Sequence, residues 1–280
     1  MSTTLTKSHG TMFQPWGIPL IQRGAKTQTQ RMAGLGEINE APNLWRFVEF
    51  SADGRALFVP TNSHAPGAPS LVKCPYGQVG DWLYVKHRHW RGGGPPGSHN
   101  DQVWDEWTRT TRWESGREIH DHSLQLDADG KHVMLTRRSG MLLPRWAARD
   151  WLQITDIRMR RVQEISEADV RAEGVPGNDD RPCDAIWCDQ CAGYGLIDAG
   201  GTEIECRNCE TAVDRFRNIW DLIHAKPKPV YQRFNGVKTP THVSHPWKDI
   251  QEDRVHRGKP WYVRGNPWEW AISFARKDGE

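Results

Sequence analysis

Apolar and polar residues alternate in several short runs of the chain, a pattern that predicts strands. The clearest hairpin covers residues 44–60, where two apolar runs flank Asp53-Gly54, a pair typical of tight turns. Residues 32–41 are predicted to be a polar loop, and residues 226–264, which are basic and contain prolines, are predicted to be irregular. Other strands are predicted at 26–31, 82–85, 151–157 and 266–274, with a second hairpin at 124–138.

Short helices are predicted from the residues at their ends. The first carries Pro19 near its start and stops at Gly24, because glycine readily adopts the left-handed conformation that ends a helix. The second begins at Ser166 with the pattern of a capping box, runs to about Glu173 and is closed by Gly174. The third, residues 216–223, is amphipathic. Strands with a few short helices predict an α+β fold.

Composition excludes two classes of protein. The chain has 280 residues, and its 37 Lys and Arg against 35 Asp and Glu give a net charge of +2. This balance excludes a strongly basic nucleic-acid clamp but permits local basic patches. A run of about 18 apolar residues, which a membrane-spanning helix requires, does not occur, so no membrane partner is expected. Residues 1–11 are predicted to be a polar extension and not a signal peptide.

The segment Gly24-x-Lys26-x-x-Thr29-x-Arg31 resembles the signature of ASCH domains, which are small β-barrels of the PUA-like superfamily. Thr29 stands where most of these domains carry an acidic residue. A threonine also occurs there in the small bacterial ASCH amidohydrolases that remove acetyl from N4-acetylcytidine. Segments that resemble phage and prophage ASCH proteins follow in order at 80–85, 144–149, 216–223 and 266–274.

The resemblance implies the architecture. We expect a mostly antiparallel PUA-like β-barrel with flanking short helices, formed by a single interrupted domain at residues 12–280. An inserted module at 183–209 would interrupt it. Membership of the phage or prophage group would place the protein in the cytoplasm of a bacterial host.

The spacing of four cysteines is the strongest chemical signal in the chain. Cys188-x-x-Cys191 and Cys206-x-x-Cys209 allow four thiolates to converge tetrahedrally on Zn²⁺, as in zinc ribbons. A four-cysteine site has no open position for water, so the zinc is expected to be structural. Cys183 is an alternative ligand. Paired spacing also indicates metal in a reducing compartment more than disulfides.

Lys26, Thr29 and Glu173 are the candidate catalytic residues. A threonine hydroxyl is a weak nucleophile and needs a base, and lysine serves as one only if burial or a neighbouring cation, here Arg31, lowers its pKa. Resemblance to the acetylcytidine amidohydrolases aligns Glu173 with their proposed catalytic glutamate. Strand alternation argues against this set, because it puts Thr29 and Lys26 on opposite faces. The same residues also suit a pocket without catalysis.

A basic and aromatic set, Lys86, Arg88 and Trp90, is a candidate surface for nucleic acid, together with Arg31 in the signature. Arginine and tryptophan suit single-stranded RNA, whose bases stack and whose phosphates need neutralising. Solvated charged faces are the simpler explanation of such clusters.

The sequence therefore predicts recognition of a nucleobase, a nucleoside or single-stranded RNA by a Lys26/Thr29/Glu173 cleft, with hydrolysis of an N4-acyl cytosine amide as its enzymatic form. The alternative is a non-catalytic phage or prophage protein that binds a protein or nucleic-acid partner through its zinc module and barrel surface.

Overall fold

The chain folds into short helices and mixed β-sheets, which confirms the predicted α+β class. It is described here by a computed structural model. The described residues are 7–61, 68–92, 102–105, 110–113, 118–119, 136–175, 196–198, 203–205, 211–225, 228–234, 237–256 and 259–277.

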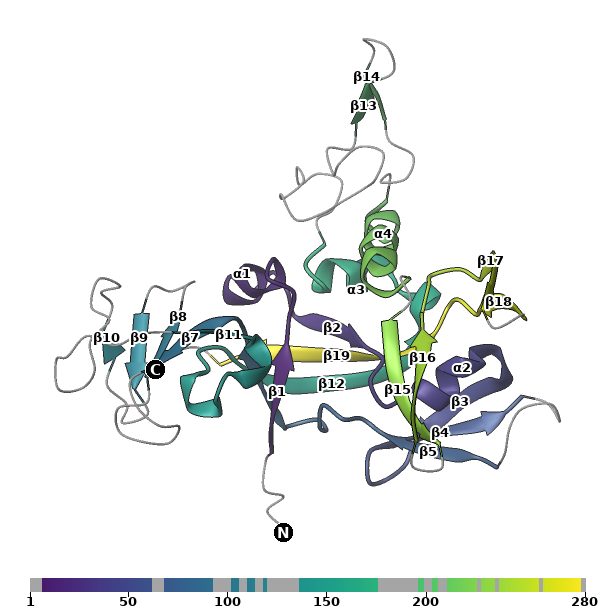
Figure 1. The fold of residues 1–280 in the computed structure, drawn as a ribbon. Coiled ribbons are helices and arrows are strands. Elements are labelled where there is room, and N and C mark those ends of the chain that lie inside the picture. Colours follow the sequence, from purple (N-terminus) through teal and green to yellow (C-terminus); the bar gives the residue numbers. More distant parts are fainter. Residues whose placement is uncertain are drawn as a thin grey trace. The chain divides into compact units, whose positions relative to one another are not determined.

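A five-stranded sheet contains the signature segment. Its strand order is β1-β6-β12-β19-β2. The strands are β1 (Ser8–Met12), β6 (Trp82–Lys86), β12 (Trp151–Arg161), β19 (Trp268–Arg276) and β2 (Gln28–Arg31). β1 and β6 are parallel, whereas β6 with β12 and β19 with β2 are antiparallel. Figure 1 shows the long strands β12 and β19 next to each other, with β2 beyond β19. Because β1 begins at Ser8, the expected polar extension joins the sheet before residue 11.

The remaining strands of the described residues form further sheets. β3, β4 and β5 form a three-stranded antiparallel sheet that contains the predicted hairpin at 44–60, with Gly54 at a φ of 75° in its turn. β7 to β11 form a second five-stranded sheet, and three antiparallel pairs complete the set. Their bounds are β3 (Trp45–Phe50), β4 (Arg55–Pro60), β5 (Ser70–Lys73), β7 (His89–Gly92), β8 (Gln102–Asp105), β9 (Thr110–Trp113), β10 (Glu118–Ile119), β11 (Thr136–Arg138), β13 (Leu196–Asp198), β14 (Glu203–Glu205), β15 (Lys228–Phe234), β16 (Val237–Val243), β17 (Ile250–His256) and β18 (Lys259–Val263).

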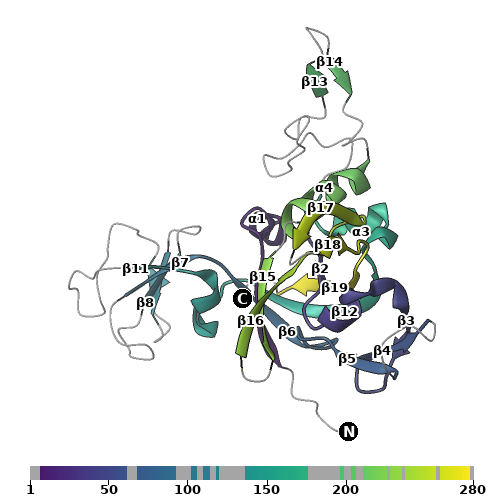
Figure 2. The same ribbon diagram turned by 45° about the vertical axis from the view of Figure 1, so that its right-hand side comes forward.

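The α-helices are α1 (Gly17–Gln22), α2 (Gly36–Glu40), α3 (Glu167–Ala172) and α4 (Ala212–His224), with short 3₁₀ turns η1 (Pro42–Leu44), η2 (Gly140–Leu142), η3 (Arg145–Ala147) and η4 (Val162–Glu164). The predicted ends of α3 are confirmed: Ser166 caps its start and Gly174, at a φ of 85°, follows its end. Gly24, at a φ of 74°, likewise follows α1. α3 contacts both α4 and β2, and Figure 2 shows it close to both.

Two predictions for irregular segments were wrong. The polar loop expected at 32–41 contains α2, because Leu35 and Ile38 are spaced to bury one helical face. The irregular segment expected at 226–264 forms two hairpins, β15–β16 and β17–β18. β-branched and aromatic residues favour strands there, and the prolines are tolerated because a two-stranded pair has only edge strands. The hairpin predicted at 124–138 lies outside the described residues except for β11.

Contacts divide the chain into two compact units, each discontinuous in sequence. One contains residues 1–24, 79–155 and 274–280, and the other contains 25–78 and 156–273. The second unit has an aromatic core in which Trp268 packs edge-on against Phe58, with ring centroids 5.3 Å apart. Trp270, two positions along β19, is fully buried. Burial of such large apolar side chains stabilises the sheet around the signature.

Candidate functional site

The second unit brings the signature segment to the C-terminal end of α3. After the stop at Gly24 the chain passes Lys26, and the backbone N–H of Thr27 donates to the carbonyl oxygen of Ala172 at 2.7 Å. β2 then begins at Gln28 and pairs with β19. The chain entering β2 is therefore anchored on the last turn of α3, where the helix leaves carbonyl groups without an intrahelical partner.

Lys26 and Glu173 meet directly. Lys26 Nζ donates to the backbone oxygen of Glu173 at 2.8 Å and forms a buried ion pair with its carboxylate oxygen Oε2. The other carboxylate oxygen, Oε1, accepts a hydrogen bond from the backbone N–H of Gln30 at 2.6 Å. Lys26 is 4% exposed and Glu173 6%. A cation at the C-terminus of α3 also interacts favourably with the helix dipole, so the lysine stabilises the helix end that holds its partner.

Thr29 does not share in these contacts. Its side chain is 4% exposed, and its backbone pairs with Ile272 on β19. Side chains alternate along a strand, and both Gln28 and Gln30 face the acids of α3, so Thr29 points to the other face of the sheet. Arg31 lies on that same face by alternation, with its guanidinium carbon 5.8 Å from the centre of the Tyr76 ring.

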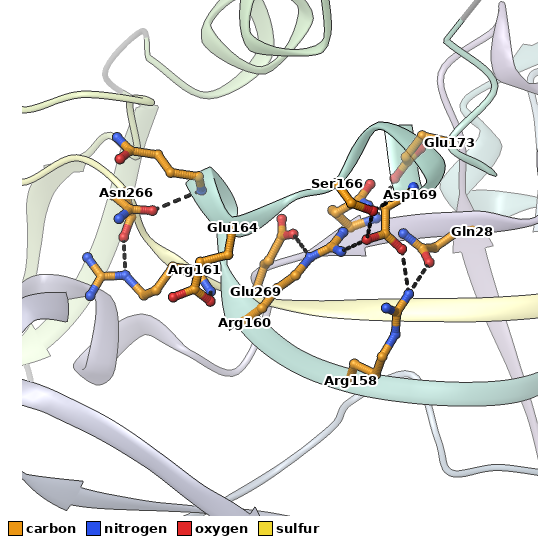
Figure 3. Close-up of polar contacts among 12 residues, drawn as sticks. Gln28, Arg158, Arg160, Arg161, Glu164, Ser166, Asp169, Glu173, Asn266 and Glu269 are labelled. Atoms are coloured by element: carbon orange, nitrogen blue, oxygen red, sulfur yellow. Dashed lines mark hydrogen bonds and ion pairs between the residues drawn. The ribbon is translucent and has the colours of Figure 1, made fainter. Parts of the chain in front are cut away.

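A network of charged residues, in which Arg160 and Glu269 are buried and Arg158 is exposed, adjoins the Lys26–Glu173 pair. Arg158 and Arg160, on β12, converge on Asp169 of α3, as Figure 3 shows. Arg158 Nη2 donates to Asp169 Oδ1 at 2.6 Å, and Arg160 Nη1 donates to Asp169 Oδ2 at 2.5 Å. Arg160 Nε donates to Glu269 Oε1, on β19, at 2.9 Å. Ser166, at the start of α3, also donates to Asp169 Oδ2, at 2.7 Å.

Two glutamine side chains on β2 join the network to the pair. Gln28 Oε1 accepts from Arg158 Nη2 at 2.6 Å (Figure 3). The Gln30 amide fits its neighbours when its nitrogen faces the Glu173 carboxylate, to which it then donates. In this orientation the Gln30 amide oxygen accepts from Arg160 Nη2 at 2.7 Å and from Gln28 Nε2 at 2.9 Å. The assembly therefore spans α3 and the strands β2, β12 and β19.

Burial shifts several pKa values in this assembly. Burial, and then the charge of Arg31, lowers the pKa of Lys26 well below its usual value. The Glu173 carboxylate acts against this shift, because an adjacent anion favours the ammonium form. Burial raises the pKa of Glu269 to about 8, although Arg160 opposes the shift. Burial also disfavours ionisation of Asp169, but hydrogen bonds from Arg158 and Ser166 and the arginine charges outweigh it and hold that pKa well below its usual range.

The predicted basic and aromatic surface lies in the first unit. Lys86, at the end of β6, donates to the backbone oxygen of Met141 at 3.0 Å, and its Nζ is 5.6 Å from the centre of the Tyr84 ring. Arg88 is exposed and Trp90 is half-buried. Lys86, Arg88 and Trp90 therefore all belong to the first unit, whereas Arg31 belongs to the second.

The four predicted zinc ligands, Cys188, Cys191, Cys206 and Cys209, lie outside the described residues, as does Cys183. The strands between the two cysteine pairs, β13 and β14, are described and pair antiparallel. Within the described ranges there is no cluster of three or more His, Cys, Asp or Glu side chains suited to a metal ion. Cys74 is a buried free thiol in the core, and burial raises its pKa to about 11.

One open pocket of about 300 Å³ occurs elsewhere in the second unit, along α4. Its lining does not include a predicted site residue. The lining residues are Arg217, Asp221, Ala225, Pro246, Trp247 and Lys248. Two of these lining residues are joined by a hydrogen bond, in which Asp221 Oδ1 accepts from the Trp247 backbone N–H at 2.7 Å.

Arg158, Arg160, Asp169 and Glu269 were not predicted from the sequence, and neither were the two glutamines. A signal was present: Arg158-x-Arg160 and Gln28-x-Gln30 each repeat a polar residue at the two-residue period of a strand. Such a repeat ordinarily marks a solvated face. Only the position of α3 over this face shows that Gln28, Gln30 and Arg160 are buried, whereas Arg158 stays exposed.

Comparison of the chain with models of protein families, with curated proteins and with solved structures found no match in any of the three. Among the described residues, no helix has the length and apolar character needed to span a membrane.

Proposed function

We propose that the protein binds a nucleobase or nucleoside, free or within single-stranded RNA, beside the Lys26–Glu173 pair. The observation that carries this proposal is the meeting of the two residues, which are separated by 147 positions in sequence. They are two of the three members of the predicted site, and the third, Thr29, does not share in their contact. We propose further that the sheets form an ASCH-like, PUA-related barrel, a view supported by the mostly antiparallel strands and short helices around this segment.

The chemistry of the assembly supports a base as ligand. The edge of a nucleobase presents hydrogen-bond donors and acceptors in one plane, and proteins read it with amide, carboxylate and cationic groups. Lys26, Glu173, Gln28 and Gln30 supply these groups on one face of β2. A modified cytosine is the favoured ligand because the signature resembles that of the acetylcytidine amidohydrolases.

Binding is favoured over hydrolysis by the alternation of β2. In the hydrolytic form, the Thr29 hydroxyl attacks the acetyl carbonyl while Lys26 accepts its proton, which requires the two side chains within hydrogen-bond reach. Thr29 and Lys26 face opposite sides of the sheet. The lowered pKa of Lys26 is the one observation that favours hydrolysis, because a neutral amine is able to accept a proton.

Chromatography separates the two forms of the proposal. The protein is incubated with N4-acetylcytidine and the mixture is analysed for cytidine. Turnover that is lost in both Lys26→Ala and Thr29→Ala supports hydrolysis. Absence of turnover, combined with a calorimetric binding signal for N4-acetylcytidine that is lost in Lys26→Ala, supports binding alone. Absence of both turnover and binding contradicts the proposal.

The alternative is a non-catalytic phage or prophage protein that recruits a partner through its zinc module and barrel surface. Two apolar side chains next to Lys86 favour this alternative, since Met141 and Leu142 are 66% and 56% exposed. Binding of single-stranded RNA across a salt series tests whether Lys86, Arg88 and Trp90 contact phosphates. Affinity that does not change with salt concentration would argue against such contacts.

A further inference from the structure

Glu269 is a buried acid at a position where the chain is otherwise apolar. It lies on β19 between Trp268 and Trp270 and is 0% exposed. Its Oε1 accepts from Arg160 Nε, whereas its Oε2 has no hydrogen-bond partner among the described residues. An unsatisfied buried polar atom costs about 1–3 kcal/mol, so a purely structural core would favour an apolar residue here.

The contacts of Arg160 connect this acid to the candidate site. A guanidinium is planar, with its donors in a fixed arrangement, so holding Nε also sets the direction of both Nη groups. Arg160 Nη2 donates to the Gln30 amide oxygen at 2.7 Å, and the Gln30 amide nitrogen donates to Glu173. Glu173 in turn contacts Lys26. An unbroken series of hydrogen bonds therefore runs from Glu269 to Lys26.

We propose that Glu269 is a positioning residue, which fixes Arg160 and thereby holds the Gln30 amide and the Glu173 carboxylate against Lys26. Its bearing on ligand binding rests on the proposed function, whereas its effect on Lys26 does not. Asp169, on α3, accepts a hydrogen bond from Nη1 of the same arginine. With Nε and Nη1 both held by acids, Arg160 has little freedom to turn away from Gln30.

Two neutral substitutions of similar size distinguish positioning from a simple effect of charge. Glu269→Gln retains a carbonyl oxygen that accepts from Arg160 Nε, whereas Glu269→Met removes the acceptor. Both remove the same carboxyl group, so any direct electrostatic influence on Lys26 changes equally in both. The readout is the pKa of Lys26, followed by NMR of the lysine side chain, with circular dichroism as the check on folding.

We expect the pKa of Lys26 to fall by about one pH unit in Glu269→Met relative to Glu269→Gln, because a close carboxylate raises the pKa of a cation by about 1–3 units and the Met variant loosens Glu173. Equal values in the two variants would overturn the proposal. Gln30→Met removes the amide that joins Arg160 to Glu173, and it is expected to lower the Lys26 pKa in the same way. This variant keeps the series of contacts testable if Glu269→Met does not fold.

The double variant Glu269→Met, Gln30→Met adds a second criterion. If both residues act through one series of contacts, its Lys26 pKa matches that of the single variants, whereas additive shifts would show independent effects and contradict the proposal. These measurements need no ligand. Failure of the protein to bind a nucleoside would therefore refute the proposed function and leave the role of Glu269 standing. Equal Lys26 pKa values in the two Glu269 variants would refute the role of Glu269 and leave the proposed function standing.

Discussion

Lys26 Nζ donates to the backbone oxygen of Glu173 at 2.8 Å and pairs with the carboxylate of the same residue. One lysine thus caps the C-terminus of α3 and neutralises the acid that ends it. These contacts attach the segment that leads into β2 to the end of α3, and under the proposed function the same two residues would also present a cation and an anion to a ligand.

Replacing Lys26 by methionine is expected to lower the free energy of unfolding by about 3–5 kcal/mol, since it leaves the Glu173 carboxylate buried without its cation. Urea denaturation measures the change. Lys73→Met, at an exposed lysine of the same unit, is the matched control and is expected to stay within about 0.5 kcal/mol of the wild type. A loss equal to that of the control would mean that the pair does not hold α3.

Stability is expected to fall as the pH rises through the range in which Glu269 titrates. Its folded-state pKa is about 8, against an ordinary value of 4.5, so between these limits the folded protein retains a proton that the unfolded chain has released. The stabilising contribution is complete below pH 4.5 and is lost as the pH approaches 8, with a slope of at most about 1.4 kcal/mol per pH unit. Denaturation of Glu269→Gln across this range should lack the slope. An identical slope in the variant would assign the effect to another group.

The contribution of Asp169 to stability is expected to have the opposite pH dependence to that of Glu269. The folded-state pKa of Asp169 is depressed, so its contribution is present above the unfolded-state pKa and is lost as the pH falls toward the folded-state value. At pH 7, Asp169→Asn should cost about 1.5–3 kcal/mol, the range for hydrogen bonds to charged groups, and the difference from the wild type should shrink in acid. Asp156→Asn, at an exposed partner of Arg158, is the control and should change stability by less than about 0.5 kcal/mol.

The local parts of the fold were predictable because their signals are local. Ser166 and Gly174 delimit α3, and Asp53-Gly54 marks the β3–β4 hairpin, through the conformations that these residue types adopt in isolation. α2 was missed because Leu35 and Ile38 stand alone in a polar segment, too few for a clear period. The hairpins within 226–264 were missed because their prolines weigh against strands unless the edge position is known.

The candidate site was predictable only in part, because several of its contacts join segments that are far apart in sequence. Lys26 and Glu173 were selected by resemblance to a known signature, and the contact between them is in the structure. The contact of Arg160 with Glu269 depends on the pairing of β12 with β19, two strands whose contacting residues are 109 positions apart in sequence. No local pattern encodes that relationship. The role of Thr29, by contrast, was already questioned by strand alternation.

The zinc module is predicted to carry one equivalent of Zn²⁺ per chain. Cys188→Ser should lose the metal and lower stability, because zinc binding at a site of this type contributes to folding. Cys74→Ser, which alters a buried thiol of the core, is the control: it should lose stability and keep its zinc. Retention of a full equivalent in Cys188→Ser would exclude this cysteine as a ligand and point to Cys183 in its place.

Binding at the Lys26–Glu173 pair is tested most directly by titrating N4-acetylcytidine, and cytidine for comparison, into protein carrying labelled lysine, while the side-chain NMR signal of Lys26 is followed. The account predicts a saturable shift of the Lys26 signal, with a dissociation constant of about 1 mM or tighter. The Lys73 signal should remain constant, and the Lys26 shift should be absent in Glu173→Gln. An unchanged Lys26 signal at saturating nucleoside would contradict the account.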